Sequence, residues 1–321
     1  MPGGSRYLGA RLNPSPIRKP PRIRSGDVVG VIAPAGVVDP DRLARGVRIL
    51  ESWGWRVEVG SAVLDRQAYL AGADDARLAD VVRMLDDRRI RAIFCARGGY
   101  GSQRILPRID LDRLAGDPKP IVGYSDVTAL LNAAVAAGVA AVHGPMVADD
   151  IARGLTERST QHLRSLLGDP AWRWDAETPA TVRPGRARGR LLGGCLAVLV
   201  ATLGTPWAPA TDGAILFLED VAERPYRLDR LLTQLRQSGK LDRVAGIVFG
   251  TMAACPPIDG LDALAVVRAC LGDLACPIAF GLPAGHDPNA AACENLALPF
   301  GIEVELDTER GRLVGLEAAV V

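Results

Sequence analysis

Short apolar runs alternate with amphipathic stretches through the first half of the chain. Val28 to Ala33 is an apolar run closed by Pro34, which is typical of a buried parallel strand. Asp39 to Trp53 has apolar residues at helical spacing and stops at Gly54. The alternation continues with expected strands over 56–59, 90–95 and 121–123, and expected helices over 74–87 and from about 126. This order predicts βαβ units on a parallel sheet.

Residues 151–185 interrupt this rhythm. They hold a polar helical stretch over 156–167 and then a segment rich in Pro, Gly and Arg, a composition that often connects domains. Beyond it the expected strands and helices are less regular, and the tail is strand-like. We therefore expect a flexible arm over 1–22, an N-terminal α/β domain over 23–150, a linker region over 151–185 and a C-terminal domain over 186–321.

Composition narrows the class of protein. The chain has 321 residues, of which 48% are hydrophobic and 23% charged, so a largely disordered chain is excluded. Its net charge of +1 gives no general attraction to nucleic acid or to an anionic membrane, and we expect neither as a partner. The six cysteines form no C-x-x-C pair, which argues against structural zinc. No secretory signal is evident, so we expect a cytoplasmic protein with reduced cysteines.

Two loops follow apolar strands, at the sheet edge where parallel α/β folds bind ligands. The first loop, 97–101, reads R-G-G-Y-G and matches no nucleotide-phosphate motif. Its glycines either let backbone N–H groups approach a substrate or form a tight turn. The second loop, G-Y-S-D, places Ser125 between a strand and a helix, where its hydroxyl can be exposed beside an oxyanion. The string alone favours a helix N-cap for Ser125, since Ser before an apolar helix is a common cap and the second glycine of G-x-S-x-G is missing.

A serine hydrolase also needs a base, and the chain has three histidines. His162 lies in a polar helical stretch and is expected on the surface. His143 ends a short apolar segment, so it is expected at a strand end near Ser125. His286 follows a buried strand in a loop that can reach a cleft. Each histidine alone can also be structural.

An acid is needed to orient the base. Glu219 and Asp220 close the apolar strand AILFLED, at the rim where active sites are built. Either carboxylate can instead cap a helix or form a salt bridge. Glu223 and Asp229 are less attractive, because they fall on the following turn and helix.

Several strings occur together in the order of one known family: GDVVGVIAPAG, YLAGADDARLAD, ARGGYGSQRILPRID, PKPIVGYSDVTALL, HGPM, LLGGCLAVLVATLGTPW, ILFLEDVAERPYRLDRLLTQLRQSGKL and NLALPFG. They span about residue 24 to residue 302. In these strings the chain resembles the L,D-carboxypeptidase (muramoyltetrapeptide carboxypeptidase) family of serine peptidases. The resemblance implies an N-terminal Rossmann-like parallel-sheet domain and a C-terminal β-rich α+β domain, with the site at their interface.

The resemblance also implies the site. The serine of GYSD is Ser125, the glutamate of the LED string is Glu219 and the histidine of the GH string is His286, which together form a catalytic triad. By the same resemblance, the backbone N–H groups of Gly99 and Asp126 form the oxyanion hole. Further residues of the matched motifs are expected to contact substrate, since an arginine suits a terminal carboxylate: Arg97, Tyr100 and Arg227.

The implied activity is release of the terminal D-alanine from a murein tetrapeptide, by cleavage of an L,D peptide bond through an acyl-enzyme. This belongs to cell-wall peptide recycling and requires no metal or organic cofactor. The family is commonly homodimeric. One alternative is a branch of the family that cleaves peptidyl- or aminoacyl-nucleotides and confers antibiotic immunity. Another is a small-molecule binding protein that has lost catalysis, against which the intact triad argues.

Two departures from the family pattern affect the site. Cys195 stands where the family usually has Asn in a GGN string, so a side-chain hydrogen bond near the domain junction is lost. After His286 the stretch DPNAAACE precedes Asn295, where the family has a shorter connection. Contacts at the rim of the site and specificity are therefore expected to differ.

Overall fold

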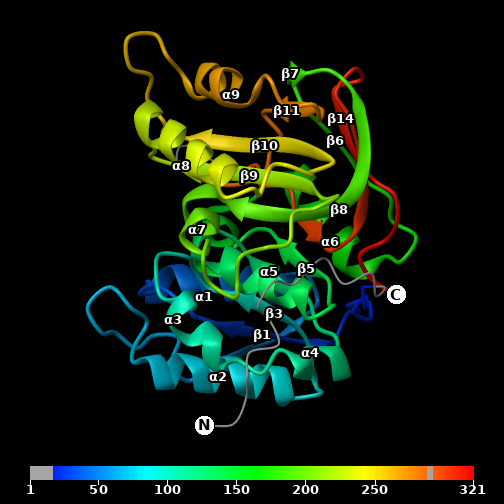
Figure 1. Ribbon diagram of the computed structural model, residues 1–321. Coiled ribbons are helices and arrows are strands. Elements are labelled where there is room, and N and C mark those ends of the chain that lie inside the picture. Colours follow the sequence, from blue (N-terminus) through cyan, green and yellow to red (C-terminus); the bar gives the residue numbers. More distant parts are fainter. Residues whose placement is uncertain (1–16, 288–291) are drawn as a thin grey trace.

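Two β-sheets, one above the other in Figure 1, organise the chain. The structure is a computed structural model that describes residues 17–287 and 292–321. The lower sheet has six strands, which are β1 (Val28–Ile32), β2 (Arg56–Val59), β3 (Ile90–Cys95), β4 (Ile121–Gly123), β5 (Ala141–His143) and β12 (Leu298–Phe300). Their order is β12-β5-β4-β3-β1-β2.

Strands β1 to β5 are parallel, which confirms the expected Rossmann-like arrangement. The connecting helices include α1 (Pro40–Ser52), α2 (Asp74–Asp86), α3 (Ser102–Ile105), α4 (Asp112–Gly116) and α5 (Thr128–Ala136). Local signals set their ends. At the start of α1, the Asp39 side chain accepts a hydrogen bond from Arg42 N at 2.9 Å, while Pro40 opens the first turn. Gly54, with φ +92°, lets the chain turn back after the helix.

The upper sheet is mixed. It contains β6 (Asp175–Glu177), β7 (Ala180–Arg183), β8 (Arg186–Cys195), β9 (Ile215–Val221), β10 (Gly246–Ala253), β11 (Ile278–Phe280), β13 (Glu303–Asp307) and β14 (Arg312–Gly315). The central strands β8 to β11 are parallel and the flanking pairs antiparallel. Helices α7 (Leu196–Ala201), α8 (Pro225–Gln237) and α9 (Ala263–Leu271) make the crossovers that parallel strands require.

The chain passes between the two sheets more than once. Strand β12, near the C-terminus of the chain, pairs antiparallel with β5 in the lower sheet. The interval 151–185, expected as a linker, holds α6 (Glu157–Gly168) and the two outer strands of the upper sheet. Of the expected arm, 1–16 lie outside the described residues, while Arg18 N donates to Gly138 O at 2.8 Å. The domain boundaries themselves stay a prediction.

The end of β8 lies against the start of α5, and this contact fixes the sheets at the level of the site. Thr128 Oγ1 accepts a hydrogen bond from Cys195 N at 3.0 Å, and Asn132 Nδ2 donates to Gly193 O at 2.7 Å. A Cβ at Gly194 would lie 2.5 Å from Thr128 Oγ1, so only glycine permits this approach. One apolar core contains buried residues of both sheets, among them Val142 and Phe217. Within the described part of the chain, no helix is long and apolar enough to cross a bilayer.

Candidate active site

Ser125 sits in a strained turn at the end of β4. Its φ is +61°, a left-handed conformation that is uncommon for a residue with a side chain and that clusters at functional sites. Ser125 is the first residue of a short 3₁₀ helix (Ser125–Val127), whose N-cap is Tyr124, and the N-cap of α5 is Val127. The N-cap interpretation therefore does not describe this serine. The turn places Ser125 just beyond the carboxyl end of β4, where the residue is half-buried.

The glycine-rich loop after β3 packs directly on this serine. A Cβ at Gly98 would lie 2.8 Å from Ser125 Cβ, 2.9 Å from its Oγ and 3.6 Å from Asp126 N. Gly99 has φ +106° and faces Gly36, with 3.1 Å between its Cβ position and Gly36 Cα. Gly98, which the sequence reasoning did not single out, thus makes the close approach to the hydroxyl. The two consecutive glycines in the sequence were the signal that could have identified Gly98, since neither position has room for a side chain.

Buried Glu219 and partly buried His286 form a hydrogen-bonded pair. Glu219 lies in β9 with its side chain 0% exposed, and its Oε2 is 2.7 Å from His286 Nδ1. The same oxygen accepts a bond from His286 N at 3.1 Å. Because the carboxylate occupies Nδ1, the other ring nitrogen, Nε2, is left for proton transfer. A Cβ at Gly285 would lie 2.6 Å from Glu219 Oε2, so glycine lets the histidine loop come this close.

Charge pairing outweighs burial at both groups. Burial disfavours the imidazolium of His286, but the neighbouring Glu219 carboxylate raises the pKa of His286 above its ordinary value. Burial likewise acts to raise the pKa of Glu219, and the His286 imidazole holds that pKa below its ordinary value instead. Each partner therefore stabilises the charged form of the other, as general-base catalysis requires.

Tyr124 brings the two parts of the site together. It directly precedes Ser125, and its ring centroid is 4.8 Å from that of His286 at an interplanar angle of 67°. The loop after β4 of the lower sheet thus contacts the histidine loop that Glu219 of the upper sheet holds. Strained serine, buried carboxylate and imidazole lie in one region that both sheets contribute to.

The other two histidines have different surroundings. His143 is the last residue of β5, is fully buried, and its ring centroid is 4.8 Å from that of Phe217. Burial lowers the pKa of His143 to about 4. The expectation that His162 lies on the surface is wrong: it is 6% exposed and its Nε2 lies 2.8 Å from Ala297 O. A backbone carbonyl and two tryptophan rings bury this polar residue of an amphipathic helix.

Asp220, the second acid at the end of β9, points elsewhere. Its Oδ2 accepts a hydrogen bond from Ala197 N at 2.9 Å, and its Oδ1 accepts one from Val221 N at 2.8 Å. Burial raises the pKa of Asp220 to about 6. Cys195, at the position where an asparagine was expected, lies with its Sγ 3.6 Å from Asp220 Oδ1. Of the two candidate acids, Glu219 alone is bonded to the histidine.

The expected substrate contacts are distributed between two segments. Arg97 and Tyr100 are exposed on the glycine-rich loop, and Arg97 Nη1 donates to Val37 O at 2.7 Å. Arg227, in the first turn of α8, donates from Nε to Glu223 Oε2 at 2.5 Å, so its charge is already paired. Asp126 has a structural carboxylate, since its Oδ2 accepts a hydrogen bond from Ser102 N at 2.8 Å.

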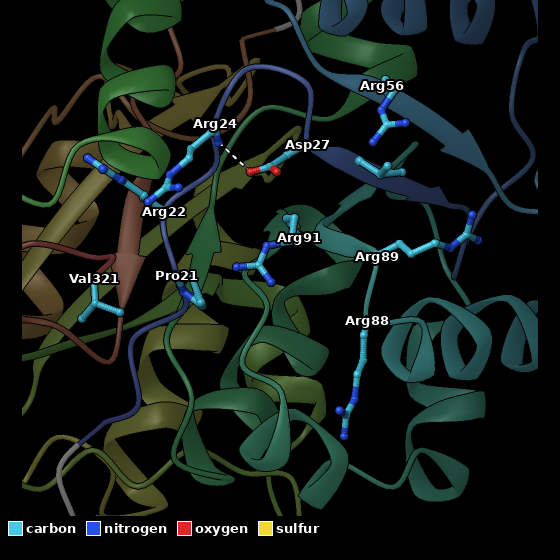
Figure 2. A pocket seen from close by; sticks show the side chains of 10 residues that line it. Pro21, Arg22, Arg24, Asp27, Arg56, Arg88, Arg89, Arg91 and Val321 are labelled. Atoms are coloured by element: carbon cyan, nitrogen blue, oxygen red, sulfur yellow. Dashed lines mark hydrogen bonds between the residues drawn. The ribbon is translucent and has the colours of Figure 1, made fainter.

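A hollow of about 520 Å³ lies at the opposite edge of the lower sheet. Its lining includes residues at or before the amino ends of β1, β2 and β3, and six arginines contribute to it, as Figure 2 shows. Arg88 and Arg89 point away from Arg91 and Arg22 there, so the guanidinium groups do not converge on one point. The residues given as its lining include none of the candidate triad. Among the residues the structure describes, no cluster of three or more His, Cys, Asp or Glu could hold a metal ion.

A serine in a strained turn beside glycine backbone, together with a histidine that is hydrogen-bonded to a buried carboxylate, is typical of the active site of a serine hydrolase. Comparison with known proteins agrees with this class. The sequence profiles of the LD-carboxypeptidase N-terminal and C-terminal domains match residues 29–144 and 188–306. The chain belongs to the LD-carboxypeptidase family and is a hydrolase.

Individual relatives support the same placement. The probable murein peptide carboxypeptidase of Bacillus subtilis is 38% identical over 94% of this chain and 95% of its own. The murein tetrapeptide carboxypeptidase of Pseudomonas aeruginosa is 35% identical over 88% and 94%. Among solved structures, the muramoyltetrapeptide carboxypeptidase of Oxalobacter formigenes is 29% identical, with a TM-score of 0.80 over 89% of this chain and 97% of that one.

Proposed function

We propose that this protein is a serine carboxypeptidase that releases the terminal D-alanine of murein tetrapeptide. The observation that carries the proposal is the 2.7 Å contact between buried Glu219 and His286, whose ring packs against Tyr124, the residue directly before a serine held at φ +61°. A carboxylate-oriented imidazole next to a strained serine is suited to acyl transfer. The names of relatives that span nearly the whole chain support murein tetrapeptide as the substrate.

The steps follow from the groups present. Ser125 Oγ attacks the carbonyl carbon of the L,D bond while His286 Nε2 takes its proton. The N–H groups of Asp126 and Gly99 are the proposed donors to the oxyanion, and the closeness of Gly98 to Ser125 supports this location. Proton return from His286 to the leaving amine releases D-alanine. Water then attacks the acyl-enzyme by the same route.

The glycine-rich loop is the proposed site for the terminal carboxylate. Arg97 lies directly before Gly98 and is exposed, and its Nη1 bond goes to a neutral carbonyl, while no ion pair within 17–287 and 292–321 involves it. Tyr100 follows on the same loop. Arg227 is the less favoured of the two arginines, because Glu223 already accepts two hydrogen bonds from it.

Mass spectrometry of the products tests the function. Purified protein is incubated with murein tetrapeptide and, in parallel, with a peptidyl-nucleotide. We expect loss of one alanine from the tetrapeptide and no cleavage of the peptidyl-nucleotide. Cleavage of the nucleotide conjugate alone would favour the antibiotic-immunity branch. Absence of both activities, with no labelling of Ser125 by a fluorophosphonate probe, would favour a binding protein.

Location and assembly are also proposed from the family. Recycled murein peptides are processed inside the cell, so we propose that the enzyme acts in the cytoplasm as a homodimer, on a small peptide and without nucleic acid. Light scattering coupled to gel filtration gives the mass in solution, which should be twice that of the 34.0 kDa chain. A mass of one chain at micromolar concentration would contradict the dimer.

A further inference from the structure

Asp150 is a fully buried carboxylate that the steps above do not use. Its Oδ2 accepts a hydrogen bond from Met146 N at 3.0 Å. Its Oδ1 accepts bonds from the Tyr124 hydroxyl at 3.0 Å and from Arg153 Nη2 at 3.0 Å. The thiol of Cys293 lies 3.3 Å from the same oxygen. A buried group with this many partners specifies the geometry of what surrounds it.

These bonds reach both sides of the candidate site. Tyr124 directly precedes Ser125, and its ring packs against that of His286. Arg153 uses its second terminal nitrogen, Nη1, to donate to Asp287 O at 2.6 Å. That carbonyl belongs to the residue directly after His286. One carboxylate is thereby connected to the residue before the serine and to the residue after the histidine.

The donors favour the ionised form of Asp150. Burial raises the pKa of this carboxyl, and the Asp149 charge acts in the same direction. Against this, the peptide N–H of Met146 and the guanidinium of Arg153 can only donate, and they occupy different oxygens. Protonation would remove the negative charge that these donors stabilise. The charge-assisted bond to Arg153 is also of the stronger kind.

We propose that Asp150 is a positioning residue, which through Tyr124 and Arg153 holds His286 in line with Ser125. The inference rests on the proposed function, since it takes Ser125 and His286 as the reacting pair. The geometry supports it because both arms end within one residue of that pair. A displacement of about 1 Å between reacting groups can lower turnover by about 10²-fold, so such support has a measurable effect.

Charge gives a second, independent signal. The charged and titratable groups that act on His286 come from three elements: Glu219 and Asp220 in β9, Asp150 in the turn after β5, and His143 in β5. Glu219 has the largest effect among the carboxylates that raise the pKa of His286, and Asp150 adds to it. Asp150→Asn should therefore lower the pKa of His286 and move the acidic limb of activity to lower pH. Tyr124→Phe removes one arm but keeps the charge.

The test compares three variants of the full chain. Asp150→Asn and Tyr124→Phe change the network. Asp80→Asn is the matched control, because Asp80 is another buried carboxylate, 2% exposed, that accepts bonds from Ser61 N at 2.9 Å and Ala62 N at 2.8 Å. The readouts are kcat and KM on murein tetrapeptide, and NMR titration of the His286 imidazole. Only three histidines need assignment.

Asp150→Asn should lower kcat by roughly 10- to 100-fold with KM changed less than about threefold, as expected when reacting groups are misplaced. It should also lower the pKa of His286. Tyr124→Phe should lower kcat by about tenfold and leave the His286 titration in place. Asp80→Asn should leave kcat and the titration unchanged.

Equal kcat in the Asp150→Asn and Asp80→Asn variants, together with an unchanged His286 titration, would overturn the inference. If Asp150→Asn does not fold, the kcat of Tyr124→Phe decides. A value within about twofold of wild type would then contradict the positioning role, since misplaced reacting groups lower kcat by more than this. The titration needs no substrate. If the wild-type protein does not cleave the tetrapeptide, but the pKa of His286 falls in Asp150→Asn, the proposed function is overturned and the positioning role remains supported.

Discussion

The imidazoles of His143, which is fully buried, and His286, which is partly buried, both contact the Tyr124 ring, with centroids 5.4 Å and 4.8 Å from it, and their surroundings shift their pKa values in opposite directions. His286 has Glu219 at 2.7 Å from Nδ1, and that carboxylate raises the pKa of His286. For His143, neither ring nitrogen has a hydrogen-bond partner among the residues that the structure describes, and burial lowers the pKa of His143 to about 4. Burial without a charged partner therefore keeps the His143 imidazole neutral near pH 7. A carboxylate partner turns a similarly placed ring into a candidate base.

Removal of the paired imidazole should have the largest effect. His286→Ala should lower kcat by roughly 10⁶-fold, as loss of a serine-hydrolase base does. Ser125→Ala should cost about the same, and the double variant no more, since the two act as a unit. Steady-state kinetics on murein tetrapeptide gives the values, with thermal unfolding as the control for folding. If His286→Ala stays within tenfold of wild type, the base is elsewhere.

Removal of the carboxylate charge should make His286 resemble His143. Glu219→Gln should lower kcat by roughly 10⁴-fold, because the tautomer and the charge partner are both lost. The pKa of His286 should fall, since burial is then unopposed. The residual activity should have its acidic limb at lower pH, because the base loses its proton there. An acidic limb at the wild-type position would show that Glu219 does not set the pKa of the base.

A side chain on the glycine-rich loop should act on turnover more than on stability. Gly98→Ala places a methyl group 2.9 Å from Ser125 Oγ, in the space that the oxyanion and its donors need. Loss of one such donor costs roughly 10²–10³-fold in kcat, and Gly99→Val should behave similarly. Gly116→Ala is the control, because its Cβ would meet nothing within 4 Å. Parallel losses of activity and melting temperature would mean that Gly98 serves folding alone.

The smallest effect on activity is expected at His143. His143→Leu should leave kcat within a few-fold and leave the acidic limb in place. It should, however, alter acid stability. The folded-state pKa of about 4 lies below the ordinary 6.5, so the unfolded chain binds more protons between these values. Wild-type stability should therefore fall as pH drops through this window.

His143→Leu should remove about 2–3 kcal/mol of that loss near pH 4.5. Urea unfolding at pH 7 and pH 4.5, on wild type and variant, measures the difference. Identical pH dependence in both proteins would mean that His143 is not the buried neutral group described above.

Local patterns predicted most of the fold. The bounds expected for the strands at 56–59, 90–95 and 121–123 agree with those of β2, β3 and β4. A short segment between two helical stretches leaves little choice of where a strand can begin and end. The linker interval was harder to interpret. Its strands β6 and β7 are half exposed and pair only with distant residues, β14 and β11, so their sequence carries no strong apolar alternation.

Resemblance supplied the triad residues, while the long-range contacts needed the structure. Nothing near His162 along the chain reveals that Ala297 O accepts its hydrogen bond. Gly98, Tyr124 and Asp150 were missed for the same reason, since their partners lie in separate loops. Asp150 follows Asp149 in a short helical segment, Val147–Ile151, and its complete burial depends on Tyr124, Cys293 and helix α1, which come from other parts of the chain.

The central claim is that Ser125 is the nucleophile of an acyl-enzyme formed with murein tetrapeptide. The most direct measurement is intact-protein and peptide mass spectrometry of enzyme quenched with acid during turnover, with Glu219→Gln included to slow the reaction. We expect a mass increase equal to the tripeptide acyl group, carried on the peptide that contains Ser125 and absent in Ser125→Ala. Turnover without that adduct, or an adduct on another residue, would contradict the account.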